Sequence, residues 1–168
     1  SCLEEVEKVM KKAEKEKNSP ELIKALIHKL IYVQNVEEDT FVKIQETLEK
    51  GLENHPVSMQ AFLNSMIAEQ YWNYFNQNRW RFYDRSATVQ SVQTDIRTWD
   101  LKKIVETVLE YHEKALEHPQ ELIRTPIDDF RNVLVEGCYS RELRPSLFDF
   151  IAHRALDFYM NNDAGLTR

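Results

Sequence analysis

Residues 20–34, PELIKALIHKLIYVQ, decide the fold class of this chain. Apolar side chains recur there every three or four positions, which is the spacing of one face of an α-helix. These positions are Leu22, Ile23, Leu26, Ile27, Leu30 and Ile31. Ser19 suits an N-cap and Pro20 suits the first helical turn, so a helix is predicted to begin here. The stripe is wide, and we therefore expect neighbours on two sides of this helix.

The same spacing continues over most of the chain. The predicted helices span residues 3–17, 20–34, 38–54, 57–76, 99–117 and 141–160, and a long loop spans 78–98. Glycine occurs 3 times and proline 5 times, which long helices tolerate and hairpin-rich sheets usually do not. The pattern therefore predicts an all-α protein.

The order of the predicted helices favours pairs. Narrow apolar stripes alternate with wide ones, and the first two pairs begin roughly 35 residues apart, near the period of tetratricopeptide-like hairpins. We predict antiparallel helical hairpins stacked in a short tetratricopeptide-like right-handed array, with the first helix paired with the second, the third with the fourth and the fifth with the last. A closed helical bundle is the alternative.

Length and composition predict one helical domain over residues 1–168. The sequence starts at Ser1, inside a helical pattern and without an initiator methionine, so we expect a fragment of a longer protein. A net charge of −6 weighs against nucleic acid as a partner. Because no apolar run reaches the roughly 20 residues that span a bilayer, we expect no direct membrane insertion.

Histidine and cysteine spacing predicts neither a metal centre nor a catalytic one. Cys2 and Cys138 are too few for a disulfide framework or a zinc site. His112 and His118 are six positions apart, about 240° around a helix, so one ion cannot bind both. Phosphate loops, dinucleotide fingerprints and nucleophile elbows are missing from the sequence. We therefore expect no enzyme activity and no cofactor.

Asp149, His153 and Asp157 follow one another at four-residue intervals on the last predicted helix. Side chains at this spacing share one helix face, and a carboxylate can orient an imidazole. We interpret them as a solvated polar stripe, with ligand or metal binding as the alternative.

The most unusual stretch is YWNYFNQNRWRFYDR, residues 71–85, which we call the aromatic segment. Aromatic side chains alternate there with Asn and Arg, a composition that can pack on the core or clamp a peptide or sugar. The candidate contact residues are Trp72, Tyr74, Arg79, Trp80, Arg81, Phe82, Arg85 and Trp99.

Several motifs also carry a resemblance to a known family. They are YWNYFNQNRWRF, Asp84-Arg85, Thr98-Trp99-Asp100, RELRPSLFDFIAHRALDFYMN and EEVEKVMKKAEKEKNSPELIKALIHKL. Together they resemble the N-terminal helical region of the large alpha-2-macroglobulin-like proteins of Bacteroidetes-type bacteria, over nearly the whole chain. The resemblance implies an exported protein, periplasmic or associated with the outer membrane or surface, whose family traps or inhibits proteases.

This chain departs from the working parts of that family. In Cys2-Leu3-Glu4-Glu5, a Glu stands where a thioester motif needs Gln, and no bait region is recognisable. We therefore expect a non-catalytic interaction or scaffold domain that contacts other domains of its parent chain or another protein. The alternative is a helical-repeat module that binds peptide or glycan through the aromatic segment.

Overall fold

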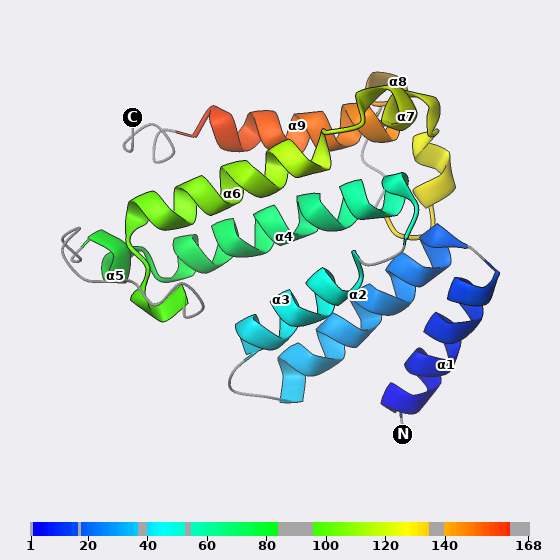
Figure 1. Ribbon diagram of the computed structural model, residues 1–168, viewed down its shortest axis with the longest axis horizontal. Helices are drawn as coiled ribbons and strands as arrows, with labels where there is room; N and C mark the ends of the chain where they lie inside the picture. The colour runs from blue at the N-terminus through cyan, green and yellow to red at the C-terminus, as the bar shows by residue number, and fades with distance from the viewer. Residues whose placement is uncertain are drawn as a thin grey trace.

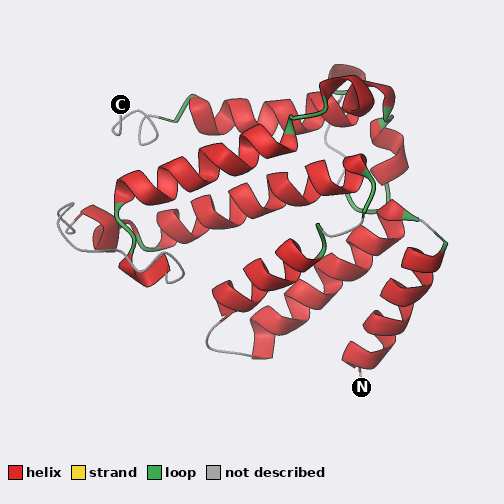
Figure 2. Cartoon of the chain, viewed as in Figure 1, coloured by secondary structure: helices red, strands yellow, loops and turns green. Residues whose placement is uncertain are grey.

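The computed structural model describes residues 2–16, 18–36, 40–52, 55–83, 96–134 and 140–161. Throughout these residues the regular structure is helical, and the one β-type contact is an isolated bridge between Pro126 and Ser146 (Figure 2). The predicted all-α class is confirmed. None of the helices in these ranges combines the length and the apolar character needed to cross a bilayer.

The helices follow one another in a simple order (Figure 1). They are α1 (Cys2–Lys15), α2 (Ser19–Val36), α3 (Thr40–Lys50), α4 (Val57–Gln77), α5 (Arg79–Tyr83), η1 (Ile96–Thr98), α6 (Leu101–Ala115), α7 (Pro119–Arg124), η2 (Ile127–Phe130), α8 (Ser140–Leu143) and α9 (Leu147–Tyr159). Helices α1, α2 and α3 run up and down beside one another, and α4 and α6 lie side by side in opposite directions.

Helix α4 is the centre of the molecule. It packs against α2, α3, α5, α6, α7 and α9, and its largest contact is with α6. A helix that is apolar on several faces must be buried on several faces, and α4 is apolar almost all round. Its fully or nearly buried apolar residues are Met59, Ala61, Phe62, Leu63, Ile67, Ala68, Tyr71 and Phe75.

A glycine and an ion pair join two of the outer helices, α3 and α9, to α4. Gly51, just after α3, lies so close to α4 that an added Cβ would stand 3.1 Å from Leu63 Cδ1. Arg154 of α9 forms an ion pair with Glu69 of α4. The outer helices are therefore tied to α4 by close packing and by charge.

Two features differ from the sequence prediction. The segment predicted as one helix, 141–160, is α8 followed by α9, because Pro145 has no N–H to donate and disfavours helical backbone at Arg144. Helix α9 instead begins after Ser146, whose side chain accepts a hydrogen bond from the Asp149 N–H in a reciprocal capping box.

The pairing of the helices differs as well. The fifth predicted helix, now α6, packs chiefly on α4, while the last, α9, packs on α4 and α7. The predicted loop 78–98 contains α5 and η1, and its residues 84–95 lie outside the described ranges. Stacking in a right-handed tetratricopeptide-like array stays a prediction.

Candidate functional site

Some rings of the aromatic segment, and Trp99 further along the chain, pack inside the molecule. Phe82 is 2% exposed and Trp99, which follows η1, is 5% exposed. Trp72 meets Phe158 of α9 edge to face with ring centroids 4.8 Å apart, and Tyr74 meets Phe82 in the same way at 6.2 Å. Phe82 and Trp99 are therefore not available to a partner of the folded domain, and Trp72 and Tyr74 present only part of their surface.

Three of the predicted contact residues lie on α5 at the surface. Trp80 is 64% exposed, and the Arg81 guanidinium carbon lies 5.0 Å from the centroid of its ring. The Arg79 guanidinium lies 5.6 Å from the Phe75 ring. Arg85 is outside the described residues. Contacts through Trp80, Arg79 and Arg81 stay a prediction.

The three residues of the predicted polar stripe, Asp149, His153 and Asp157, have different surroundings. Asp149 accepts hydrogen bonds from the backbone N–H and the hydroxyl of Ser146, at 3.0 and 2.7 Å, and so caps α9. His153 is half-buried and Asp157 is exposed. Within the part of the chain that the structure describes, no group of three or more His, Cys, Asp or Glu side chains is placed to hold a metal ion.

A different feature emerges between α3 and α6, which flank α4 on opposite sides (Figure 1). One cleft opens there and a second opens between α4 and α6, with Leu52 after α3 at its side, and Tyr111 of α6 lines both of them. The larger, about 420 Å³, is the Gln45 cleft, and the smaller, about 310 Å³, is the Asn64 cleft. We call the two together the α3–α6 groove.

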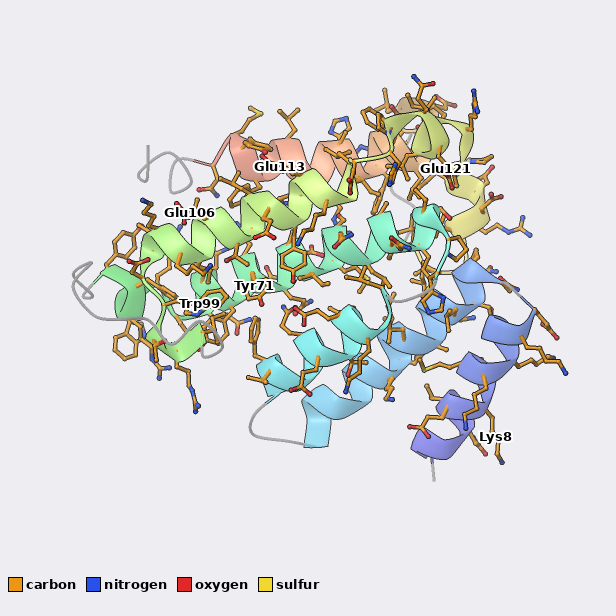
Figure 3. The ribbon with its side chains drawn as sticks, in the orientation of Figure 1. Lys8, Tyr71, Trp99, Glu106, Glu113 and Glu121 are labelled. Carbon is orange, nitrogen blue, oxygen red and sulfur yellow. The ribbon has the colours of Figure 1, made fainter. Side chains whose placement is uncertain are left out.

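Stacked aromatic rings form one wall of the Gln45 cleft. The Tyr71 ring stacks on Trp99 at 5.5 Å and on Tyr111 at 5.8 Å, and Phe41 of α3 meets it edge-on at 5.4 Å. Figure 3 shows Tyr71 and Trp99 together on the side of the molecule where α3 and α6 face each other. Such offset and edge-to-face arrangements are the favoured contacts between aromatic rings.

Gln45 is the buried polar group of this cleft. Its side chain is 5% exposed, and neither its amide nitrogen nor its amide oxygen has a hydrogen-bond partner among the described residues. A buried amide without partners costs stability, on the order of 1–3 kcal/mol. A group of this kind in a native protein needs an explanation, and a ligand is one.

A hydrogen bond crosses the groove between its two clefts. The Tyr111 hydroxyl of α6 donates to Glu49 Oε1 of α3 at 2.9 Å. Burial, with Glu49 and Glu110 adding negative potential, raises the pKa of Tyr71 to about 12. Burial and the bond to Glu49 likewise hold the pKa of Tyr111 well above its ordinary value of 10.0. Both phenols therefore keep their protons at neutral pH.

The Asn64 cleft also holds a buried amide, and it shares Tyr111 with the Gln45 cleft. Asn64 of α4 is 8% exposed, and its amide oxygen has no hydrogen-bond partner in the described part of the chain. Gln60, one turn earlier, donates to the His55 carbonyl at 2.7 Å and fixes the entry to α4. Lys114 and His118 also line this cleft.

Sequence reasoning did not select Gln45 or Asn64. Each is a polar residue at an inward-facing position: Gln45 lies within the stripe of Ile44 and Leu48, and Asn64 follows Phe62 and Leu63. That misfit is the signal that was available. The pattern shows that a polar side chain occupies an apolar position, but it does not show which residues of other helices lie next to that side chain.

Comparison of the chain with protein-family models, with curated proteins and with solved structures gives no match. The resemblance to the helical region of alpha-2-macroglobulin-like proteins therefore stays a prediction.

Proposed function

We propose that this domain is a non-catalytic interaction module that binds an extended polypeptide segment in the α3–α6 groove. The observation that supports it is a pair of buried amides that line two clefts sharing Tyr111: both amide atoms of Gln45 and the amide oxygen of Asn64 have no hydrogen-bond partner among the described residues. A side-chain amide carries one donor group and one acceptor, as a peptide unit does. The two amides together suit two peptide units of one bound strand.

The dimensions of the groove agree with a short segment. Its α6 wall includes Lys103 in the Gln45 cleft and Lys114 in the Asn64 cleft. These residues are about 16 Å apart along a helix that rises about 1.5 Å per residue. An extended chain advances about 3.3 Å per residue, so roughly five residues span that length.

The groups of the groove favour binding over catalysis. Tyr71 and Tyr111 remain protonated at neutral pH and act as hydrogen-bond donors and stacking surfaces rather than as nucleophiles. Aromatic anchors beside buried amides are typical of recognition surfaces. We therefore retain the expectation that the domain is not an enzyme.

The setting of the module is proposed from the resemblance alone. In that setting the domain lies on the N-terminal side of an exported alpha-2-macroglobulin-like protein, periplasmic or at the outer membrane, whose family traps proteases. The bound segment then belongs to another domain of the parent chain or to a separate protein. Nucleic acid is not part of this proposal.

The test uses replacement of each buried amide by an apolar side chain of similar size. Gln45→Leu is expected to raise the free energy of unfolding by about 1 kcal/mol, because it removes an unpaired buried amide. It is expected to weaken peptide binding at least tenfold. Asn64→Leu is expected to behave in the same way, and Gln120→Leu, an exposed change on α7, serves as the control.

Binding is measured by calorimetry with hits from a library of blocked pentapeptides, and stability by urea unfolding. If no pentapeptide binds the wild-type protein, the proposal is wrong. It is also wrong if peptides bind Gln45→Leu and Asn64→Leu as tightly as they bind the wild type.

A second candidate function follows from Trp80. Its indole is 64% exposed on α5, and exposed aromatic faces stack on sugars. One face already carries the Arg81 guanidinium, which leaves the other for a ligand. Tryptophan fluorescence that stays constant across a glycan panel would remove this candidate.

A further inference from the structure

We infer that the Gln45 cleft selects a basic side chain, lysine or arginine, at one position of the bound polypeptide. This inference rests on the proposed function and adds the chemistry of the occupant. It is carried by three observations on the same cleft: its carboxylates, its aromatic faces and the buried amide beside them.

The charges that line the cleft are mainly negative. Glu46 and Glu49 enter from α3, and Lys103 is the ammonium group among the residues that line the cleft. Glu110 enters from α6 and is paired with Lys114 at 2.7 Å, so Glu46 and Glu49 are the carboxylates that a ligand meets. Glu49 receives its hydrogen bond from the neutral Tyr111 phenol, so that contact leaves its charge in place. The raised pKa of Tyr71, in part an effect of Glu49 and Glu110, reports the same negative potential. A cation entering from solvent is attracted to this position.

Two lysines of the protein already lie over rings of the aromatic wall. Lys103 Nζ lies 5.6 Å from the centroid of the Trp99 ring, and Lys114 Nζ lies 4.9 Å from that of Tyr111. Cations over the faces of Trp and Tyr are stabilised by the ring quadrupole, and more so when desolvated. Of the rings in this wall, Phe41 and Tyr111 are only partly buried, and they offer apolar surface to the stem of a basic side chain whose charged head lies near the carboxylates.

The buried amide explains why a peptide-borne cation fits better than a free one. Gln45 and Glu49 are one turn apart on α3, so they face the cleft together. A rotation of the Gln45 side chain toward the cleft lets its amide pair with the backbone of the segment while the carboxylates bind the side chain of the segment. A free amine satisfies only the second part of the site.

The experiment compares blocked pentapeptides that are identical except at the central position, which carries arginine, lysine, citrulline or glutamate. Arginine and lysine peptides are expected to bind at least tenfold more tightly than the citrulline peptide. The preference is expected to shrink in 0.5 M salt, because exposed charges are screened. Calorimetry on the full chain measures each dissociation constant.

A double variant, Glu46→Gln with Glu49→Gln, removes two charges while Gln at position 49 still accepts the Tyr111 hydrogen bond. It is expected to bring the arginine-to-citrulline ratio of binding constants close to one. Glu113→Gln, an exposed change on α6 that lines neither cleft, is the matched control (Figure 3).

Each outcome of this experiment decides something. A basic preference that the double variant abolishes supports the inference. Peptides that bind with equal strength whatever the central residue overturn the inference and leave the proposed function standing. The absence of any peptide binding overturns both. Concentration-dependent self-association that the double variant abolishes assigns the cleft to a second copy of the chain, and this also overturns the inference.

Discussion

At the scale of single residues, His112 couples stability to pH. Its side chain is 4% exposed on α6, and burial, with the nearby Arg154 charge, lowers its pKa from 6.5 to about 4. Between these two values the unfolded chain binds a proton that the folded chain does not. The contribution to stability is therefore complete above pH 6.5 and is lost as the pH falls toward 4, by at most about 3 kcal/mol.

Urea unfolding at pH 7 and pH 4.5 measures this contribution. Because carboxylates also titrate in this range, the decisive quantity is the difference between the wild type and His112→Gln. The wild type is expected to lose more stability than the variant. Equal losses would show that the imidazole titrates normally.

The hydrogen bond from Tyr111 to Glu49 belongs to the same scale. Tyr111→Phe and Glu49→Gln are each expected to cost little, because Glu49 is exposed. A double-mutant cycle with Tyr111→Phe and Glu49→Ala is expected to give a coupling free energy of about 0.5–1 kcal/mol. A coupling of zero would mean that the bond does not hold α6 to α3 in solution.

The site shows how far single residues can be interpreted from sequence. The aromatic segment was singled out for its composition, yet Phe82 and Trp99 are core residues. A sequence rich in aromatic residues is typical of a buried core as much as of a binding surface. Gln45 and Asn64 do not stand out in the sequence, because the clefts that they line are formed in part by α6, which is distant in the chain.

At the scale of elements, α9 depends on its cap. Ser146 is 7% exposed, and its hydroxyl oxygen accepts from the Asp149 N–H at 3.2 Å. Ser146→Ala removes this acceptor and is expected to lower the free energy of unfolding by about 1 kcal/mol. Asp157→Ala, an exposed change on the same helix, is expected to stay within about 0.5 kcal/mol of the wild type.

Urea denaturation followed by circular dichroism compares the two variants. Equal effects of Ser146→Ala and Asp157→Ala would count against the capping box. A larger loss on Ser146→Ala than about 2 kcal/mol would point to the adjoining backbone. There the Leu147 N–H donates to the Thr125 carbonyl at 2.9 Å and joins α9 to the chain after α7.

Helix positions were easier to predict than helix junctions. Apolar periodicity placed α2 and α4, because burial on several faces leaves a wide stripe in the sequence. The same periodicity runs from Ser140 through α9 without a gap, so a prediction based on it missed the helix break at Pro145. Backbone geometry at Pro145 outweighed the side-chain pattern.

At the scale of the whole molecule, stability depends on α4. Leu63 is 0% exposed, and its side chain approaches Gly51 at the end of α3. Leu63→Ala is expected to cost about 2–5 kcal/mol, the range for a leucine removed from a tight core. The loss is expected in tryptophan fluorescence and circular dichroism alike, in a single transition.

Leu143→Ala is the matched control, because Leu143 of α8 is 74% exposed. It is expected to change the free energy of unfolding by less than about 0.5 kcal/mol. Two separate transitions in the Leu63→Ala protein would mean that the α1–α3 part folds without α4.

The overall class was predictable, whereas the partnership of the helices was not. Periodicity identifies which face of a helix is apolar, and this sufficed for an all-α protein. It does not say which other helix covers that face. The choice of α6 as the main neighbour of α4 depends on shape complementarity between segments separated by α5 and η1.

The walls of the α3–α6 groove come from separate parts of the chain, one ending at residue 50 and the other starting at residue 101. Unfolding pulls them apart, so a ligand of the groove binds only the native state. By mass action, a ligand present at one hundred times its dissociation constant adds about 2.7 kcal/mol to stability. In a chain of this size that raises the melting temperature by roughly 5–10 °C. Heat resistance is thus a label-free reporter with which extracts and compound collections can be screened for the natural occupant.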